Sequence, residues 1–278
     1  MGIILAILLF SAIIIIHELG HFLLAKANGI RVDEFSLGLG PTLFGKQFGE
    51  TKFSVKLLPF GGACMMGEDD VEDISEGSFN SKSVWARMSV IVAGPLFNLI
   101  LAWILCMIMI AWVGYRTPVV GGVIDGYSAQ EQGLSEGDVI TKIGGRSVHI
   151  WNDISLYNLT HSEEKEVEIT YKRDGKTHTA VLEPRQKEGD TAPLLGVTGG
   201  KMERPGFFGT LKYGAYTVKY WIDYTVDSLR MLVTGRVGMK DLSGPVGIVS
   251  AVDGVYQEAA PAGLSVIILN LMNIGILI

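Results

Sequence analysis

The sequence has only two cysteines in 278 residues, and their placement leaves little room for cysteine chemistry. Cys64 precedes the second apolar run of the chain and Cys106 lies inside it, and no CxxC pair or other ligand-type spacing occurs. We therefore expect neither a structural disulfide nor a cysteine-ligated metal. A strong excess of one charge is also missing, because the formal net charge is -6 and both signs are mixed along the chain. This balance argues against nucleic acid as a partner, since nucleic-acid binding rests on clustered positive charge.

The first apolar run lacks the two marks of a signal peptide. No basic residue precedes it, and no small-residue cleavage site occurs before the HELGH stretch. We therefore interpret the run as a retained helix. Lys26 and Arg31 follow it directly, so the positive-inside rule places the N-terminus outside the cytoplasm and the next segment inside.

Long apolar runs, by contrast, are abundant. Hydrophobic residues make up 48% of the chain and are concentrated in three blocks, residues 3–25, 88–113 and 263–278. The first two blocks are long enough to cross a bilayer, which takes about 20 apolar residues in a helix. The third is shorter and has no polar flank, so we expect it to be the start of a third membrane helix in a fragment of a longer protein.

The segments between these blocks predict three further structures. Residues 28–87 are rich in glycine and alternate in polarity around Lys52–Leu57, which indicates β-hairpins that dip partly into the membrane. Residues 115–188 indicate a compact α+β module of short strands and turns. Residues 208–233 place aliphatic and tyrosine side chains on opposite helix faces. We expect that helix to pack on the preceding module and lie at the membrane interface, with direct substrate contact as the alternative.

The stretch His17–His21, HELGH, contains the candidate metal ligands and the candidate general base. Residues four apart share one face of a helix, so His17 and His21 can bind one Zn²⁺ while Glu18 acts as the general base. Bound zinc lowers the pKa of water to about 7 and so prepares it for attack on a carbonyl carbon. Ionisable residues inside an apolar helix are costly, at about 2.5–3.5 kcal/mol for a charged group, which favours a functional site over packed histidines.

Several further motifs accompany HELGH in a fixed order. They are FSLGLGP (35–41), PFGG (59–62), MGED (66–69), VAGPLFNLILA (92–102), GLSEGDVITKIGG (133–145) and LSGPVGI (242–248). In this combination the chain resembles the bacterial site-2 proteases over nearly its whole length. The resemblance implies a zinc-dependent intramembrane protease that cuts the membrane-spanning segments of proteins such as anti-sigma factors, and that can also process remnant signal peptides. It implies a bacterial inner-membrane location within the lipid bilayer, an active site toward the cytoplasm, and a single extracytoplasmic PDZ domain whose ligand is unknown.

The predicted fold class is a multi-pass α-helical membrane protein with a re-entrant β-hairpin region and an extracytoplasmic α+β PDZ domain. The expected segments are a first membrane helix with HExxH (1–27), a cytoplasmic, re-entrant β-hairpin loop (28–87), a second membrane helix (88–114), the PDZ domain (115–188), an extracytoplasmic amphipathic helix with a linker (189–259), and the start of a third membrane helix (260–278).

The resemblance also implies residues that the spacing alone does not identify. The family's third zinc ligand is an aspartate in an LDG motif, which we expect beyond Ile278 because Asn273-Ile274-Gly275 matches the stretch that precedes it. Asp253-Gly254 is a possible substitute, which we reject because its surroundings are polar. The resemblance further implies a substrate-handling role for Gly94, Pro95, Asn98 and Asn273, while for Asn98 and Asn273 an ordinary interhelical hydrogen bond is the alternative.

Two other classes of protein compete with this interpretation. A membrane-anchored PDZ protein with an incomplete, inactive metal site would bind peptides without turnover. A transporter that uses His17 and Glu18 as a proton relay would need partner ionisable residues in other helices, and residues 88–113 contain none.

Overall fold

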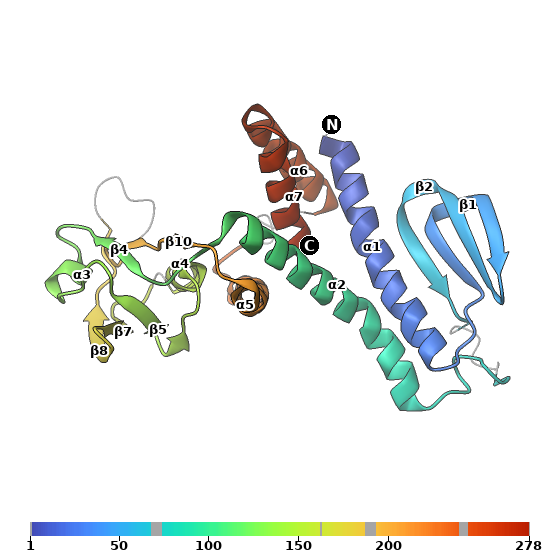
Figure 1. Cartoon of the computed structure of the whole chain (residues 1–278), viewed down its shortest axis with the longest axis horizontal. Coiled ribbons are helices and arrows are strands. Elements are labelled where there is room, and N and C mark those ends of the chain that lie inside the picture. The colour runs from blue at the N-terminus through green and yellow to red at the C-terminus, as the bar shows by residue number, and fades with distance from the viewer. Residues whose placement is uncertain (1, 68–73, 162, 187–192, 239–243, 278) are drawn as a thin grey trace. The chain divides into compact units, whose positions relative to one another are not determined.

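The computed structural model describes residues 2–67, 74–161, 163–186, 193–238 and 244–277 (Figure 1). It divides into two compact units, unit 1 with residues Met1–Leu105 and Ser243–Ile278, and unit 2 with residues Cys106–Leu242. The predicted boundary after residue 188, and parts of the MGED and LSGPVGI motifs, lie outside the described residues.

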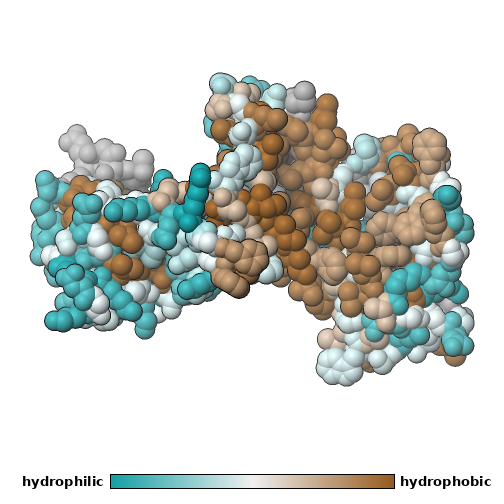
Figure 2. All heavy atoms as spheres, viewed as in Figure 1, coloured by the Kyte–Doolittle hydropathy of each residue, from teal (hydrophilic) through white to brown (hydrophobic). Residues whose placement is uncertain are grey.

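Two long apolar helices lie in unit 1, the second of them with its residues 84–105. They are α1 (Gly2–Ala27) and α2 (Val84–Val113), and both are long and apolar enough to cross a membrane by length and composition. The second starts four residues before the predicted 88, because the Ser83 hydroxyl accepts a hydrogen bond from the Ala86 N–H at 3.3 Å and caps the first turn. Figure 2 shows an extensive hydrophobic surface over these helices.

Glycine lets α1 and α2 approach each other closely. A Cβ added to Gly20 would lie 2.5 Å from the backbone oxygen of Ala93, a distance that no real side chain tolerates. Gly20 stands between the two histidines of HELGH. Small residues at such contacts are typical of helix pairs in membranes, and here Gly20 brings the backbone of α2 directly against HELGH.

The hairpin between these helices is more folded than the sequence predicts. Two 15-residue strands, β1 (Glu34–Phe48) and β2 (Thr51–Met65), pair with each other as one sheet. Residues 34–37 lie opposite 62–65 and also opposite 52–55, while residues 44–48 lie opposite 51–55. Each strand therefore acts as two short segments, joined by bends at Gly38 (φ +85°) and Gly61 (φ +87°), where a side chain would be strained.

The C-terminal helices belong to unit 1 and meet the start of α1. These are α6 (Pro245–Ala259), the short 3₁₀ turn η2 (Ala260–Ala262) and α7 (Leu264–Leu277). The carboxylate of Asp253 on α6 accepts a hydrogen bond from the Gly2 N–H at 3.0 Å, which satisfies one of the free amides at the N-terminus of α1. The single segment expected over 189–259 thus contains helices of two different units.

Unit 2 is an α+β module built on a four-stranded antiparallel sheet. The sheet order is β6 (Arg146–Ser147), β5 (Val139–Ile143), β7 (Val167–Arg173) and β8 (Lys176–Leu182). Two smaller pairs join β4 (Val120–Val123) to β9 (Val197–Gly199), and β3 (Tyr115–Arg116) to β10 (Met202–Glu203). Helices α3 (Ser128–Glu131) and α4 (Trp151–Thr160) complete the module. Because β9 and β10 pair with its first strands, the module extends past residue 188.

Helix α5 (Phe207–Val233) has the two faces that its sequence predicts. Tyr213, Tyr216 and Tyr220 pack against a buried cluster of unit 2 that contains Ile110, Tyr115 and Ile150. The Tyr216 ring also stacks on His149, with 3.8 Å between the ring centroids. The aliphatic face is exposed within the unit, at Ile222, Val226, Leu229 and Val233. Packing on the module is confirmed, and the membrane-interface position of the other face stays a prediction.

A bidentate ion pair should make the attachment of α5 sensitive to acid. Arg146 on β6 donates to both oxygens of the nearly buried Asp227 on α5, at 2.5 and 3.1 Å. These hydrogen bonds lower the pKa of Asp227 below its ordinary value of 3.8, so the stabilisation is present above that pH and is lost as the pH falls below it. The protection of the α5 amides against hydrogen exchange, after correction for the intrinsic exchange rate, should therefore fall as the pH drops below 3.8.

The matched variants separate this pair from an exposed one on the same helix. Arg146→Ala leaves a buried carboxylate without its partner and should cost about 1–3 kcal/mol at pH 7. Lys219→Ala removes an exposed i,i+4 pair with Asp223 and should change stability by less than about 0.5 kcal/mol. Equal α5 exchange rates in the two variants would contradict the assignment.

Candidate metal centre

The two histidines of HELGH point toward one spot on α2. Their rings lie edge to face with centroids 4.8 Å apart. A Cβ added to Gly94 would lie 2.5 Å from the Nε2 atom of His17 and also 2.5 Å from that of His21. Since the position of this added Cβ is so close to both nitrogens, the two Nε2 atoms converge on it. Because Gly94 has no side chain, the space in front of the two Nε2 atoms stays open.

The other ring nitrogen of each histidine has a partner on α2. His21 Nδ1 lies 2.7 Å from the backbone oxygen of Val90. A carbonyl oxygen only accepts, so Nδ1 of His21 carries the hydrogen and Nε2 keeps its lone pair. His17 Nδ1 lies 3.3 Å from the side-chain nitrogen of Asn98. Such contacts orient metal-binding imidazoles and fix which nitrogen faces the ion.

Glu18 lies beside the last segment of β2. A Cβ added to Gly62 would lie 3.4 Å from Glu18 Cγ and 3.7 Å from Ile14 on the same helix. Residues 62–65 pair with residues 34–37 on one side. The hydroxyl of Ser11 donates to the Pro59 oxygen at 2.5 Å and ties the start of this segment to α1. The side chain of Glu18 therefore lies directly beside a β-strand.

The residues present fit a zinc ion. Two imidazoles with converging Nε2 atoms are common ligands of catalytic Zn²⁺, and an adjacent carboxylate suits a general base rather than a third ligand. Across the part of the chain that the structure describes, no cluster of three His, Cys, Asp or Glu side chains could hold a metal. Asp253 is not a third ligand, because it binds Gly2, about 22 Å from His17 at 1.5 Å per helical residue.

Of the other predicted site residues, the structure brings Gly94 and Asn98 to the histidines, and Pro95 follows Gly94 within α2. Asn273 donates to Leu269 of its own helix at 3.3 Å. Val90 and Gly62 were missed by the sequence analysis. Both act through their backbones, and a backbone contact leaves no residue-type signal for a motif to reveal.

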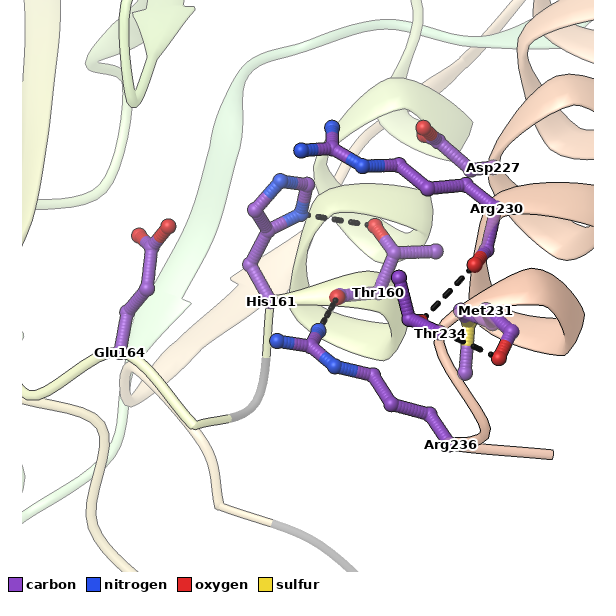
Figure 3. A pocket seen from close by; sticks show the side chains of 8 residues that line it. All are labelled: Thr160, His161, Glu164, Asp227, Arg230, Met231, Thr234 and Arg236. Atoms are coloured by element: carbon purple, nitrogen blue, oxygen red, sulfur yellow. Dashed lines mark hydrogen bonds between the residues drawn. The ribbon is translucent and has the colours of Figure 1, made fainter.

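A separate cavity of about 270 Å³ lies in unit 2 between the ends of α4 and α5 (Figure 3). Its lining residues are Thr160, His161, Glu164, Asp227, Arg230, Met231, Thr234 and Arg236. Arg236 donates to the backbone oxygen of Thr160 at 3.1 Å and forms an ion pair with Glu163 at 3.0 Å. These bonds join the segment after α5 to the end of α4.

A helix that carries HExxH with converging imidazoles, packed on a second apolar helix, defines a metallopeptidase type of site. The sequence profile of peptidase family M50 matches residues 5–277. The chain belongs to this family, which confirms the predicted site-2 protease relationship.

Two relatives show how much of the chain takes part in this similarity. A protein of Clostridium acetobutylicum, named as a zinc metalloprotease, is 38% identical over 94% of this chain and 76% of its own length. The regulator of sigma-W protease RasP of Bacillus subtilis is 29% identical over 96% of this chain and 85% of its own length.

Two solved structures resemble part of the chain. The PDZ domain of an SdrC-like protein from Listeria monocytogenes is 28% identical and covers 31% of this chain and 88% of that domain, with a TM-score of 0.26. The corresponding domain from Listeria innocua is 26% identical with the same TM-score, and covers 32% of this chain and 99% of that domain. The PDZ assignment of unit 2 therefore stays a prediction from its sequence motif.

Proposed function

We propose that this metalloendopeptidase is a zinc-dependent intramembrane protease that cleaves the membrane-spanning segments of other membrane proteins. The convergence of the His17 and His21 Nε2 atoms at Gly94, inside an apolar helix pair and beside Glu18, carries the proposal. Zinc is the metal that the names of the relatives support. The proposed location is the bacterial inner membrane, with the metal centre toward the cytoplasm and unit 2 outside.

Each residue of the site has a defined task in this reaction. When bound, zinc supplies Lewis-acid activation of water and of the scissile carbonyl. His17 and His21 hold it through Nε2, and the third ligand is proposed to come from a residue outside the described set. Glu18 takes a proton from the attacking water through its carboxylate and returns it to the amide nitrogen that leaves.

The strand beside Glu18 suggests how a substrate is presented. A transmembrane helix hides its carbonyls in its own hydrogen bonds, so it must unwind before cleavage. Gly62 lies next to Glu18, and the segment 62–65 that it begins has one described pairing partner, residues 34–37. We propose that an unwound substrate segment adds to this sheet as an extended strand. Pro95, Asn98 and Asn273 are proposed to line its path.

The proposed substrates are anti-sigma-factor-like membrane proteins, with remnant signal peptides as a further class. The name of the Bacillus subtilis relative, a regulator of sigma-W protease, supports this class. The test is cleavage of a membrane-spanning reporter by the full-length gene product in liposomes, with mass spectrometry of the products. Cuts within the apolar segment support the proposal, whereas stable peptide binding to unit 2 without any cut supports a membrane-anchored PDZ protein instead.

Metal content tests the ligand assignment. The wild-type protein should contain about one zinc per chain by elemental analysis, and His17→Ala should reduce this to near zero because it removes one of the three protein ligands of a catalytic zinc site. His178→Ala is the matched control, since His178 lies on β8 and stacks on Tyr171. If His17→Ala kept stoichiometric zinc, the assignment of His17 would be wrong.

A further inference from the structure

Asn98 contacts His17 through its side-chain amide, and within the described part of the chain only one end of that amide has a hydrogen-bond partner. Its side-chain nitrogen lies 3.3 Å from His17 Nδ1. Its side-chain oxygen is buried, and among the described residues no donor lies within hydrogen-bonding distance of it. A buried acceptor without a donor costs about 1–3 kcal/mol, so this orientation of the amide needs an explanation.

The orientation also conflicts with metal binding. If the Asn98 nitrogen donates to His17 Nδ1, then Nδ1 is an acceptor and the ring hydrogen must be on Nε2. That hydrogen would point toward Gly94, into the space that His17 and His21 share. His21 shows the opposite arrangement, because the Val90 carbonyl requires the hydrogen on Nδ1.

Turning the Asn98 amide by 180° gives its oxygen a donor and removes the conflict at His17. The oxygen and nitrogen of an asparagine amide have nearly the same shape, and their assignment depends on the hydrogen bonds they make. In the turned amide the buried oxygen accepts the Nδ1–H of His17, and Nε2 of His17 keeps its lone pair. Both histidines then present the same tautomer to the metal, one fixed by a backbone carbonyl and the other by a side chain.

We propose that Asn98 is a positioning residue that holds His17 in the Nδ1–H tautomer through its side-chain oxygen. This inference rests on the proposed zinc function. It gives the Asn98 side chain a role at His17 in the substrate-free protein. A partner that binds the far nitrogen of a metal-binding histidine typically contributes 10–100-fold to metal affinity. Asn98 should therefore influence zinc binding in the absence of any substrate.

The first test uses nitrogen NMR of ¹⁵N-histidine-labelled, metal-free full-length protein, which distinguishes the two imidazole tautomers. Wild-type His17 and His21 should both show Nδ1–H. Asn98→Leu keeps a similar side-chain volume without an acceptor, so His17 should become a mixture of tautomers while His21, held by Val90, should not change. An unchanged His17 tautomer in Asn98→Leu would overturn the proposal, whether or not the protein proves to be a protease.

The second test is zinc affinity by competition with a chelator. Asn98→Leu should weaken binding about 10–100-fold. Asn98→Asp keeps an acceptor and should stay within about threefold of wild type, which also decides the question if Asn98→Leu fails to fold. Asn28→Leu is the matched control, because Asn28 donates to Leu24 and Ser89 instead of a histidine. The positioning role would be refuted if Asn98→Leu and Asn98→Asp lost zinc affinity equally. It would also be refuted if Asn98→Leu bound zinc normally but cleaved more slowly.

Discussion

Replacing Glu18 with glutamine is expected to abolish detectable cleavage of a membrane-spanning reporter while leaving the zinc content near one per chain. Glutamine has almost the same shape but cannot accept the proton, and loss of a general base typically costs about 10²–10⁴-fold in rate. The ligands His17 and His21 are untouched, so metal binding should persist. Cleavage by purified protein in liposomes and elemental analysis of the same sample give the two measurements.

A carboxylate elsewhere in unit 1 provides the control for this substitution. Glu258 lies on α6 and is exposed, and Glu258→Gln makes the same chemical change away from the histidines. It should cleave the reporter at the wild-type rate. Equal rates for Glu18→Gln and wild type would rule out Glu18 as the base and with it the proposed catalytic role of HELGH.

The second large effect is expected at Gly94, where a single methyl group should weaken zinc binding. The alanine Cβ would lie 2.5 Å from both Nε2 atoms and 2.7 Å from His17 Cε1, so the imidazoles or the helices must shift. Overpacking typically costs about 1–3 kcal/mol, which corresponds to about 5- to 150-fold in zinc affinity if it falls on the bound state. Zinc affinity and cleavage should fall together.

Gly254→Ala is the matched control for this prediction. Gly254 lies within α6, and a Cβ added there meets nothing within 4 Å. Alanine is favoured over glycine in a helix by about 0.5–1 kcal/mol, so this variant should bind zinc normally and be at least as stable as wild type. Wild-type zinc affinity in Gly94→Ala would show that the histidines do not converge at Gly94.

The alternation of residues 52–57 indicates strands, yet it does not predict that the hairpin folds back on itself. Residues 34–37 acquire two sets of partners only because the chain bends at Gly38 and Gly61. Glycine marks a possible bend in the sequence, but many glycines here do not bend a strand. The extension of unit 2 to β9 and β10 was missed for a similar reason, because strand pairs of two or three residues carry no periodic signal.

The sequence by itself determined the elements whose signals are local. The i,i+4 spacing of His17 and His21 requires only a helix, and the long apolar runs and the two faces of α5 require only a helical period. Tertiary structure decided everything that depends on α2 lying against α1: the open space at Gly94, the Val90 carbonyl on His21, and the Asn98 amide on His17. These contacts join residues about 70 to 80 positions apart and act partly through the backbone, so only the packing of the two helices could reveal how the histidines are aimed.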